Sequence, residues 1–238
     1  MELRLHTVSV PALLGRQSLE AFERALDAAP SDRPWLLRAE SDIAFCRGMD
    51  LGEAAANVHE ASVRRFARVL TGLSRAPVPT LALVDGEARG GGVGIAAACD
   101  LVVATDRASF ALPEALFGLQ PAAIAPVLLT RLAPQKLRLW AIRASAIDAV
   151  EAERIGLVDR SIDRDHIASA LRRATRELSR ASLDALPALR ALCARALLLE
   201  QDDAITAGAE HTLDRLREPV IQERLRAFID DGAAPWSS

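Results

Sequence analysis

Three consecutive glycines, Gly90 to Gly92, follow an apolar stretch and stand at the start of a predicted helix. The first backbone N–H groups of a helix have no acceptor within it, and the helix dipole favours negative charge there. The spacing therefore predicts a site for an anionic group. A tight strand-to-helix turn would also require glycine, so the cluster alone leaves both interpretations open. It is not the GxGxxG of a dinucleotide-binding fold, since no ribose-binding acid stands at the expected distance.

A second glycine-containing segment, FCRGMDL at Phe45 to Leu51, also follows a predicted strand and precedes a predicted helix. It gives the chain a second loop in which backbone N–H groups are free to face a ligand.

One carboxyl group is placed for proton transfer. Glu114 is surrounded in the sequence by Pro113, Ala115, Leu116 and Phe117. An apolar neighbourhood favours the neutral form of a carboxyl group, as a group that both takes and gives a proton requires. The alternative is a solvated or helix-capping glutamate.

The elements that must position these residues alternate between strand and helix, which predicts an α/β fold. Apolar periodicity and the Pro and Gly breaks predict strands at 2–10, 34–40, 80–86 and 101–112, and helices at 17–29 and 52–76.

From about residue 164 the pattern is helical to the end of the chain. We therefore divide the chain into a core with the active site, 1–163, and a helical region, 164–238. The apolar positions of the helical region exceed what one short layer can bury on a small domain, so we expect it to contact a neighbouring subunit.

Composition limits the function classes. The chain has 238 residues, half of them apolar, and a net charge of -3 with scattered basic residues, which argues against a nucleic-acid binder. Neither a leader peptide nor an apolar run of membrane-spanning length is visible, so we expect a soluble, cytoplasmic protein. Cys46, Cys99 and Cys193 lack CxxC spacing and the histidines lack HExxH, so we expect no disulfide and no metal site.

Four motifs occur in order along the chain: FCRGMDL, ARGGGVGIAAACD, FALPEALFGLQP and AERIGLVDRSID. Together they resemble the crotonase (enoyl-CoA hydratase/isomerase) superfamily. The resemblance covers nearly the whole chain. It implies a ββα spiral core followed by a helical trimerisation region, and assembly as a homotrimer or a dimer of trimers.

By this resemblance, the backbone N–H groups of Met49 and Gly91 form an oxyanion hole for a thioester carbonyl, and Glu114 is the catalytic acid and base. The negative charge that develops on the carbonyl oxygen is what these N–H groups would stabilise. The resemblance implies no cofactor, because the acyl group arrives on coenzyme A or on the phosphopantetheine of an acyl carrier protein.

The family's hydratases carry another glutamate four residues into the glycine helix, where this chain has Gly94. A narrower resemblance, which includes Gly94, FGLQPA and the closing DGAAPW of Asp231 to Trp236, is to dehydratases of polyketide β-branching. It implies dehydration of a 3-hydroxy-3-methylglutaryl group on a carrier protein to 3-methylglutaconyl. A single-glutamate enoyl-CoA isomerase, a degradative hydratase and a non-catalytic acyl-thioester binding subunit are the alternatives.

We also expect substrate contacts from Gly90, Gly92, Gly94 and Phe117. Arg47 could meet a pantetheine phosphate, although a solvated loop arginine is an equal alternative. Arg64, Arg65 and Arg68 form a charged helix face that could contact an acidic carrier protein or could merely be solvated.

Overall fold

The fold is described from a computed structural model, which covers residues 5–40, 43–56, 60–180, 183, 185–196 and 201–231. The predicted α/β class is confirmed, with two sheets and a helical C-terminal region. Of the closing DGAAPW motif, only the first residue, Asp231, belongs to the described part of the chain.

The larger sheet has five strands that are all parallel, in the order β1-β2-β4-β6-β9. Its central strand β4 is buried at every position, as expected for a parallel strand covered on both faces. The strands are β1 (His6–Val10), β2 (Trp35–Ala39), β4 (Thr80–Val84), β6 (Leu101–Thr105) and β9 (Arg160–Ile162).

A smaller sheet has the order β3-β5-β7-β8, and only its last pair is antiparallel. Each of its first three strands directly follows a strand of the larger sheet, so the chain repeatedly passes from one sheet to the other. The strands are β3 (Ala44–Cys46), β5 (Glu87–Arg89), β7 (Ser109–Ala111) and β8 (Ile147–Asp148).

The prediction of one strand at 101–112 is wrong, because the chain turns between β6 and β7. The polar pair Asp106 and Arg107 interrupts the apolar run, and the N–H of Ala108 donates to the carbonyl of Thr105 at 2.9 Å. This turn moves the chain into the smaller sheet, whose strands lead toward the two glycine loops and Glu114.

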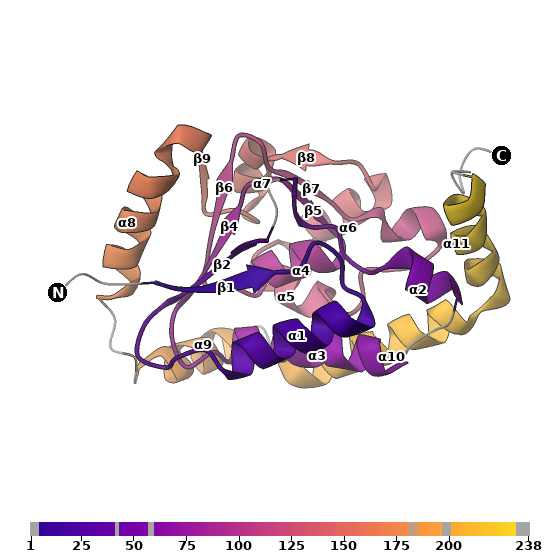
Figure 1. The fold of residues 1–238 in the computed structure, drawn as a ribbon, viewed down its shortest axis with the longest axis horizontal. Helices are drawn as coiled ribbons and strands as arrows, with labels where there is room; N and C mark the ends of the chain where they lie inside the picture. The colour runs from indigo at the N-terminus through magenta and orange to yellow at the C-terminus, as the bar shows by residue number, and fades with distance from the viewer. Residues whose placement is uncertain are drawn as a thin grey trace.

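The helices pack with apolar stripes inward. Helix α1 (Arg16–Asp27) buries Leu19, Phe22 and Leu26, at the spacing expected of one helix face. Figure 1 shows α1, α3 (Glu60–Ser74) and α10 (Gln201–Arg217) side by side along one side of the sheets, and α3 contacts both of the others. The described part of the predicted helix 52–76 forms α2 (Leu51–Ala56) and α3.

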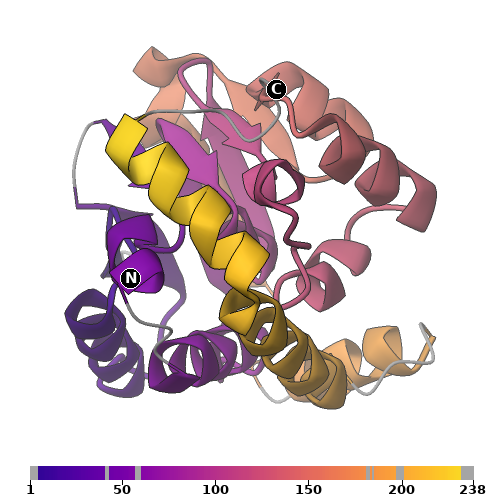
Figure 2. The same cartoon turned by 90° about the vertical axis from the view of Figure 1, so that its right-hand side faces the viewer.

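After β9 every described element is helical, as the sequence predicted. Helix α10 packs on α3, and α11 (Pro219–Asp231) packs on α2, crossing the face of the molecule seen in Figure 2. The helical region is therefore packed onto the core, and its predicted contact with a neighbouring subunit stays a prediction. The other helices of this region are η2 (Arg164–His166), α8 (Ile167–Leu178) and α9 (Ala185–Ala196).

The remaining helices lie between β5 and β9 in the chain. They are α4 (Gly91–Ala97), η1 (Pro113–Phe117), α5 (Ala125–Leu129), α6 (Pro134–Arg143) and α7 (Ala149–Ile155). Throughout the described ranges, no helix combines the length and the apolar character needed to cross a bilayer.

Candidate active site

The two glycine loops lie against each other. A Cβ atom on Gly48 would stand 2.7 Å from the carbonyl oxygen of Arg89 and 3.2 Å from the nitrogen of Gly91. Gly48 also has a φ of 83°, which L side chains rarely adopt. Only glycine therefore fits at position 48, and the residue after it, Met49, is held beside the start of α4.

The N–H groups of Met49 and Gly91 are available for a ligand. Gly91 opens α4, so its N–H precedes the helical hydrogen bonds. The loop that carries Met49 is joined to the segment before α1, since the N–H of Leu14 donates to the carbonyl of Gly48 at 2.8 Å. Within the described residues, neither the Met49 nor the Gly91 N–H has a hydrogen-bond acceptor.

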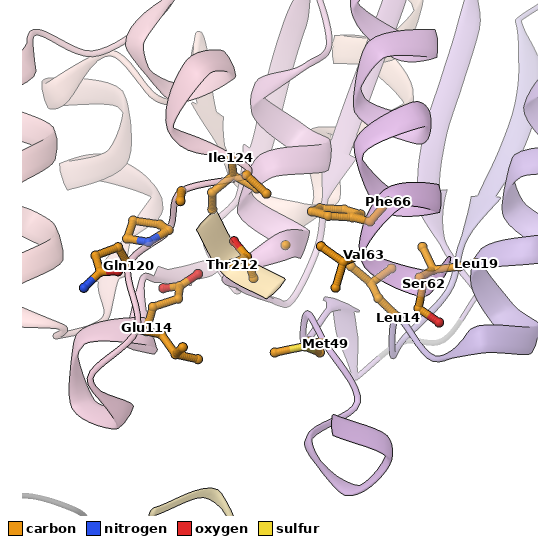
Figure 3. Close-up of a pocket in the computed structure, with 15 residues that line it drawn as sticks. Leu14, Leu19, Met49, Ser62, Val63, Phe66, Glu114, Gln120, Ile124 and Thr212 are labelled. Atoms are coloured by element: carbon orange, nitrogen blue, oxygen red, sulfur yellow. The ribbon is translucent and has the colours of Figure 1, made fainter. Parts of the chain in front are cut away.

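Both residues line a cavity of about 110 Å³. Figure 3 shows Met49, Leu14 and Val63 on one side of it, and Glu114 and Gln120 on the other. Most of the lining is apolar, so charge that develops inside is poorly screened by water and interacts strongly with nearby dipoles. The lining residues are Leu14, Leu19, Met49, Ser62, Val63, Phe66, Gly91, Glu114, Leu119, Gln120, Pro121, Ala122, Ala123, Ile124 and Thr212.

Glu114 brings a carboxyl group into this cavity from the short helix η1. The residue is half-buried, but its Oε2 atom is fully buried and has no hydrogen-bond partner among the described residues. A Cβ atom on Gly90 would stand 2.9 Å from Oε1, so the other carboxyl oxygen lies beside the glycine loop. Burial raises the pKa of Glu114 to about 7, which suits a group that takes and returns a proton near neutral pH.

The raised pKa predicts a pH dependence of folding stability. Glu114 holds its proton more tightly in the folded chain, with a pKa of about 7 against an ordinary 4.5. The free energy of unfolding should therefore fall as pH rises from about 4.5 to about 7, because the folded state must ionise a buried carboxyl group. Urea unfolding of the wild type and of Glu114→Gln across this range measures the effect. As the pH rises, the free energy of unfolding of the wild type should fall relative to that of the variant. A difference in free energy that stays constant with pH would contradict the raised pKa of Glu114.

Position 94 is closed to a side chain. A Cβ atom on Gly94 would stand 2.2 Å from the Cγ2 atom and 2.8 Å from the Cβ atom of Ile124. Ile124 is 2% exposed and lines the cavity. A methyl group of Ile124 therefore fills the space that a glutamate at position 94 would enter, and among the described residues Glu114 is the only one that brings a carboxyl group to the cavity lining.

This close contact predicts that Gly94→Glu destabilises the chain by about 1 to 3 kcal/mol, the usual cost of overpacking a core. Urea unfolding measures the loss. Adding Ile124→Ala removes the nearer obstructing atom, Cγ2, and keeps Cβ, so Gly94→Glu/Ile124→Ala should be more stable than the sum of the two single variants predicts. Additive losses would show that Ile124 does not block the position.

The cavity lining does not include Arg47, Gly92 or Phe117, which the sequence predicts to contact the substrate. The Nε atom of Arg47 pairs with the Oε2 atom of Glu87 at 2.9 Å, and Phe117 packs edge-on against Phe228 with ring centroids 5.1 Å apart. The substrate contacts of Arg47 and Phe117 stay predictions. Gly92 serves close packing, since a Cβ atom there would stand 2.1 Å from the carbonyl oxygen of Cys46.

The arginines predicted to face a carrier protein are paired within the chain. Arg65 and Arg68 each bond to Glu23 at 2.8 Å, and Arg64 pairs with Glu60 and Glu210. These pairs join α3 to α1 and α10. They leave this face with little unpaired positive charge.

Sequence reasoning missed several cavity residues. Thr212 reaches the cavity from α10. Gln120 also lines the cavity, and its Oε1 atom lies 2.7 Å from the Nε2 atom of His211, which is in α10. Ser62 of α3 contributes an Oγ atom that is buried and has no partner among the described residues. No local motif marks these side chains, because only long-range packing brings them to the cavity.

Comparison with known proteins agrees with this geometry. Residues 14–238 match the family model described as enoyl-CoA hydratase/isomerase. The crystal structure of an enoyl-CoA hydratase from Mycobacterium avium superposes with a TM-score of 0.80 at 28% identity, covering 94% of this chain and 88% of that one.

Two relatives carry more specific names. The methylglutaconyl-CoA hydratase of Mus musculus is 32% identical over 175 residues, which are 70% of this chain and 55% of the mouse protein. The bacillaene synthase dehydratase PksH of Bacillus subtilis is 33% identical over 124 residues, which are 48% of this chain and 46% of that protein. The chain thus spans about half the length of each of these relatives.

Proposed function

Because the chain belongs to the enoyl-CoA hydratase/isomerase family, we propose that it dehydrates a 3-hydroxyacyl thioester. The preferred substrate is a 3-hydroxy-3-methylglutaryl group on an acyl carrier protein, and the product is 3-methylglutaconyl. The proposal rests on the buried carboxyl group of Glu114, which among the described residues is the only carboxyl group in the cavity lining. Two backbone N–H groups without an acceptor in the described part of the chain face the same cavity.

The reaction begins at the thioester carbonyl. Its oxygen accepts hydrogen bonds from the N–H groups of Met49 and Gly91, and the ionised Glu114 removes a proton from C2. The electron pair of the broken C–H bond becomes the enolate, whose negative charge lies on the oxygen held by the two N–H groups. Preorganised donors of this kind contribute about 3 to 4 kcal/mol each to lowering a barrier.

The second step returns the proton. Neutral Glu114 donates it to the hydroxyl on C3, the C3–O bond breaks, and water leaves as the enolate electrons form the C2=C3 double bond. Glu114 is ionised again. One carboxyl group serves both steps, and a pKa of about 7 allows it to act as base and then as acid.

The closed position 94 supports a substrate whose hydroxyl leaves without a second acid. The C3 hydroxyl of a 3-hydroxy-3-methylglutaryl group is tertiary, and a tertiary hydroxyl leaves more readily than a secondary one. The names of the two relatives agree with this choice, since one acts on methylglutaconyl-CoA and the other is a dehydratase of a synthase.

A second candidate is the reverse reaction on coenzyme A, the hydration of methylglutaconyl-CoA, which the name of the mouse relative favours. The same groups would run the steps in the opposite order. The raised pKa of Glu114 supports an active enzyme over a non-catalytic binding subunit. Assembly as a trimer or a dimer of trimers stays a prediction.

The test uses 3-hydroxy-3-methylglutaryl bound to coenzyme A, to pantetheine and to a carrier protein. Loss of one water is followed by mass spectrometry, and addition of water to methylglutaconyl-CoA is measured in parallel. Dehydration of the carrier-bound substrate supports the preferred function. Activity only on coenzyme A thioesters supports the second candidate. Inactivity on all three substrates, together with no hydration of methylglutaconyl-CoA, would refute both.

A further inference from the structure

The exposed face of α6 carries positive charge that no described residue neutralises in an ion pair. Lys136, Arg138 and Arg143 are all exposed, and none forms an ion pair with another described residue. The three cations of α3, by contrast, are each paired with glutamates. A face of unpaired cations attracts an acidic partner and accelerates its approach.

Apolar side chains stand between these cations. Leu139 is 47% exposed and Ile142 is 70% exposed, while Leu137 and Trp140 on the opposite side of α6 are buried. The indole N–H of Trp140 donates to the carbonyl of Ser145 at 3.1 Å, which fixes the rotation of the helix. Val150 at the start of α7 is also 68% exposed. Mixed apolar and cationic surface of this kind is typical of protein interfaces.

The acid on which Lys136 and Arg143 act is itself paired with another arginine. Glu151 lies close enough to Lys136 and Arg143 for both to lower its pKa, although Arg154 has the larger effect. Its carboxylate is held in two hydrogen bonds by Arg154, at 2.5 Å and 2.6 Å. The cations of α6 therefore remain available to an acidic partner.

The position of α6 connects this surface to the active site. Helix α6 packs directly against η1, the element that carries Glu114. Helix α8 carries the exposed arginines Arg172 and Arg176, and Arg180 follows just after its end; none of the three has an ion pair to a described residue. In Figure 1, α8 lies at the opposite end of the molecule from α11. It carries no exposed large apolar residue among the described positions.

We propose that the α6 face, formed by Lys136, Arg138, Leu139, Ile142 and Arg143, docks the acyl carrier protein that presents the substrate. The inference rests on the proposed function. Acyl carrier proteins are acidic, so they complement three unpaired cations in charge, and Leu139 and Ile142 provide apolar area for the contact. Docking against the helix that braces η1 delivers the phosphopantetheine arm to the region of Glu114.

The test is charge reversal on α6, with a matched control on α8. Lys136→Glu/Arg138→Glu/Arg143→Glu is compared with Arg172→Glu/Arg176→Glu/Arg180→Glu, which reverses two charges on α8 and one just after its end. The substrates are 3-hydroxy-3-methylglutaryl on pantetheine and on the fatty-acid acyl carrier protein of the source organism. At low salt, kcat/KM of the α6 variant for the carrier-bound substrate should fall by on the order of 10- to 10³-fold. Its activity on the pantetheine substrate should stay at the wild-type level, and the α8 variant should match the wild type on both.

The possible results distinguish a failure of the proposed docking surface from a failure of the proposed function. Equal losses on both substrates, or no loss on the carrier-bound one, would overturn the docking surface while leaving the function intact. Wild-type inactivity on both would refute the function, and fluorescence anisotropy of labelled carrier protein would then decide docking by itself. Binding to wild type but not to the α6 variant supports the surface, and no difference overturns it. A changed oligomeric state of the α6 variant in sedimentation would instead identify the face as a contact between copies of this chain, which also overturns the proposal.

Discussion

Replacing Glu114 by glutamine is expected to lower the rate of dehydration by about 10²- to 10⁴-fold, the usual contribution of general acid–base catalysis. Glutamine keeps the size and polarity of the side chain but cannot accept the C2 proton. Thioester binding should remain near the wild-type level, because the glycine loops and the apolar lining are unchanged. Single-turnover dehydration measures the rate, and equilibrium binding of a non-reactive thioester analogue measures the affinity.

The pH dependence of the same reaction gives an independent check. Dehydration begins with ionised Glu114, so kcat/KM for the wild type should rise with pH through about 7 and then level off. The residual activity of Glu114→Gln should lack this rise. Glu223→Gln, which removes an exposed carboxylate from α11, is the control and should keep the wild-type rate and profile. Equal rates for Glu114→Gln and wild type would remove Glu114 from the reaction.

The family resemblance implies the roles of Met49, Gly91 and Glu114, and their meeting in one cavity follows from their places just after strands. Met49, Gly91 and Glu114 follow β3, β5 and β7, which are adjacent in the smaller sheet. Parallel strands bring their carboxyl ends to one edge, so residues far apart in the chain meet there. The turn at Asp106 was missed because the apolar residues on both sides of it read as one continuous strand.

Residues whose place depends on packing between distant elements could not be predicted in this way. Ile124 closes position 94 and Thr212 enters the cavity from α10, yet neither belongs to a motif. The ion pairs of surface arginines could not be predicted from the sequence either. From the sequence, Arg64, Arg65 and Arg68 could contact an acidic carrier protein or be solvated, whereas in the structure they pair with glutamates from α1, α10 and the start of α3. Ion pairing across helices depends on the fold and leaves no local pattern.

The second large effect is expected at Gly91, where the backbone N–H can be removed while the helix is kept. Gly91 is the first residue of α4, a position at which proline is tolerated because its N–H has no acceptor within the helix. Gly91→Pro should therefore remove one oxyanion donor and leave α4 in place. Gly90, with φ of 47° and ψ of -113°, has the backbone freedom of glycine to accommodate the following ring.

Gly91→Ala is the matched control, since it adds a Cβ atom but keeps the N–H. In either variant this atom would stand 2.7 Å from the Cδ1 atom of Leu14 and 3.1 Å from the Cζ atom of Phe66, both at the ends of side chains. The steric cost of the Cβ atom is therefore shared, and the ratio of the two rates reports the loss of the N–H together with the ring carbon that replaces its hydrogen. Gly91→Pro should be slower than Gly91→Ala by about 10²- to 10³-fold in kcat, the usual loss for one oxyanion donor. Thermal unfolding verifies that both variants fold, and equal kcat values in two folded variants would show that the Gly91 N–H does not stabilise the enolate.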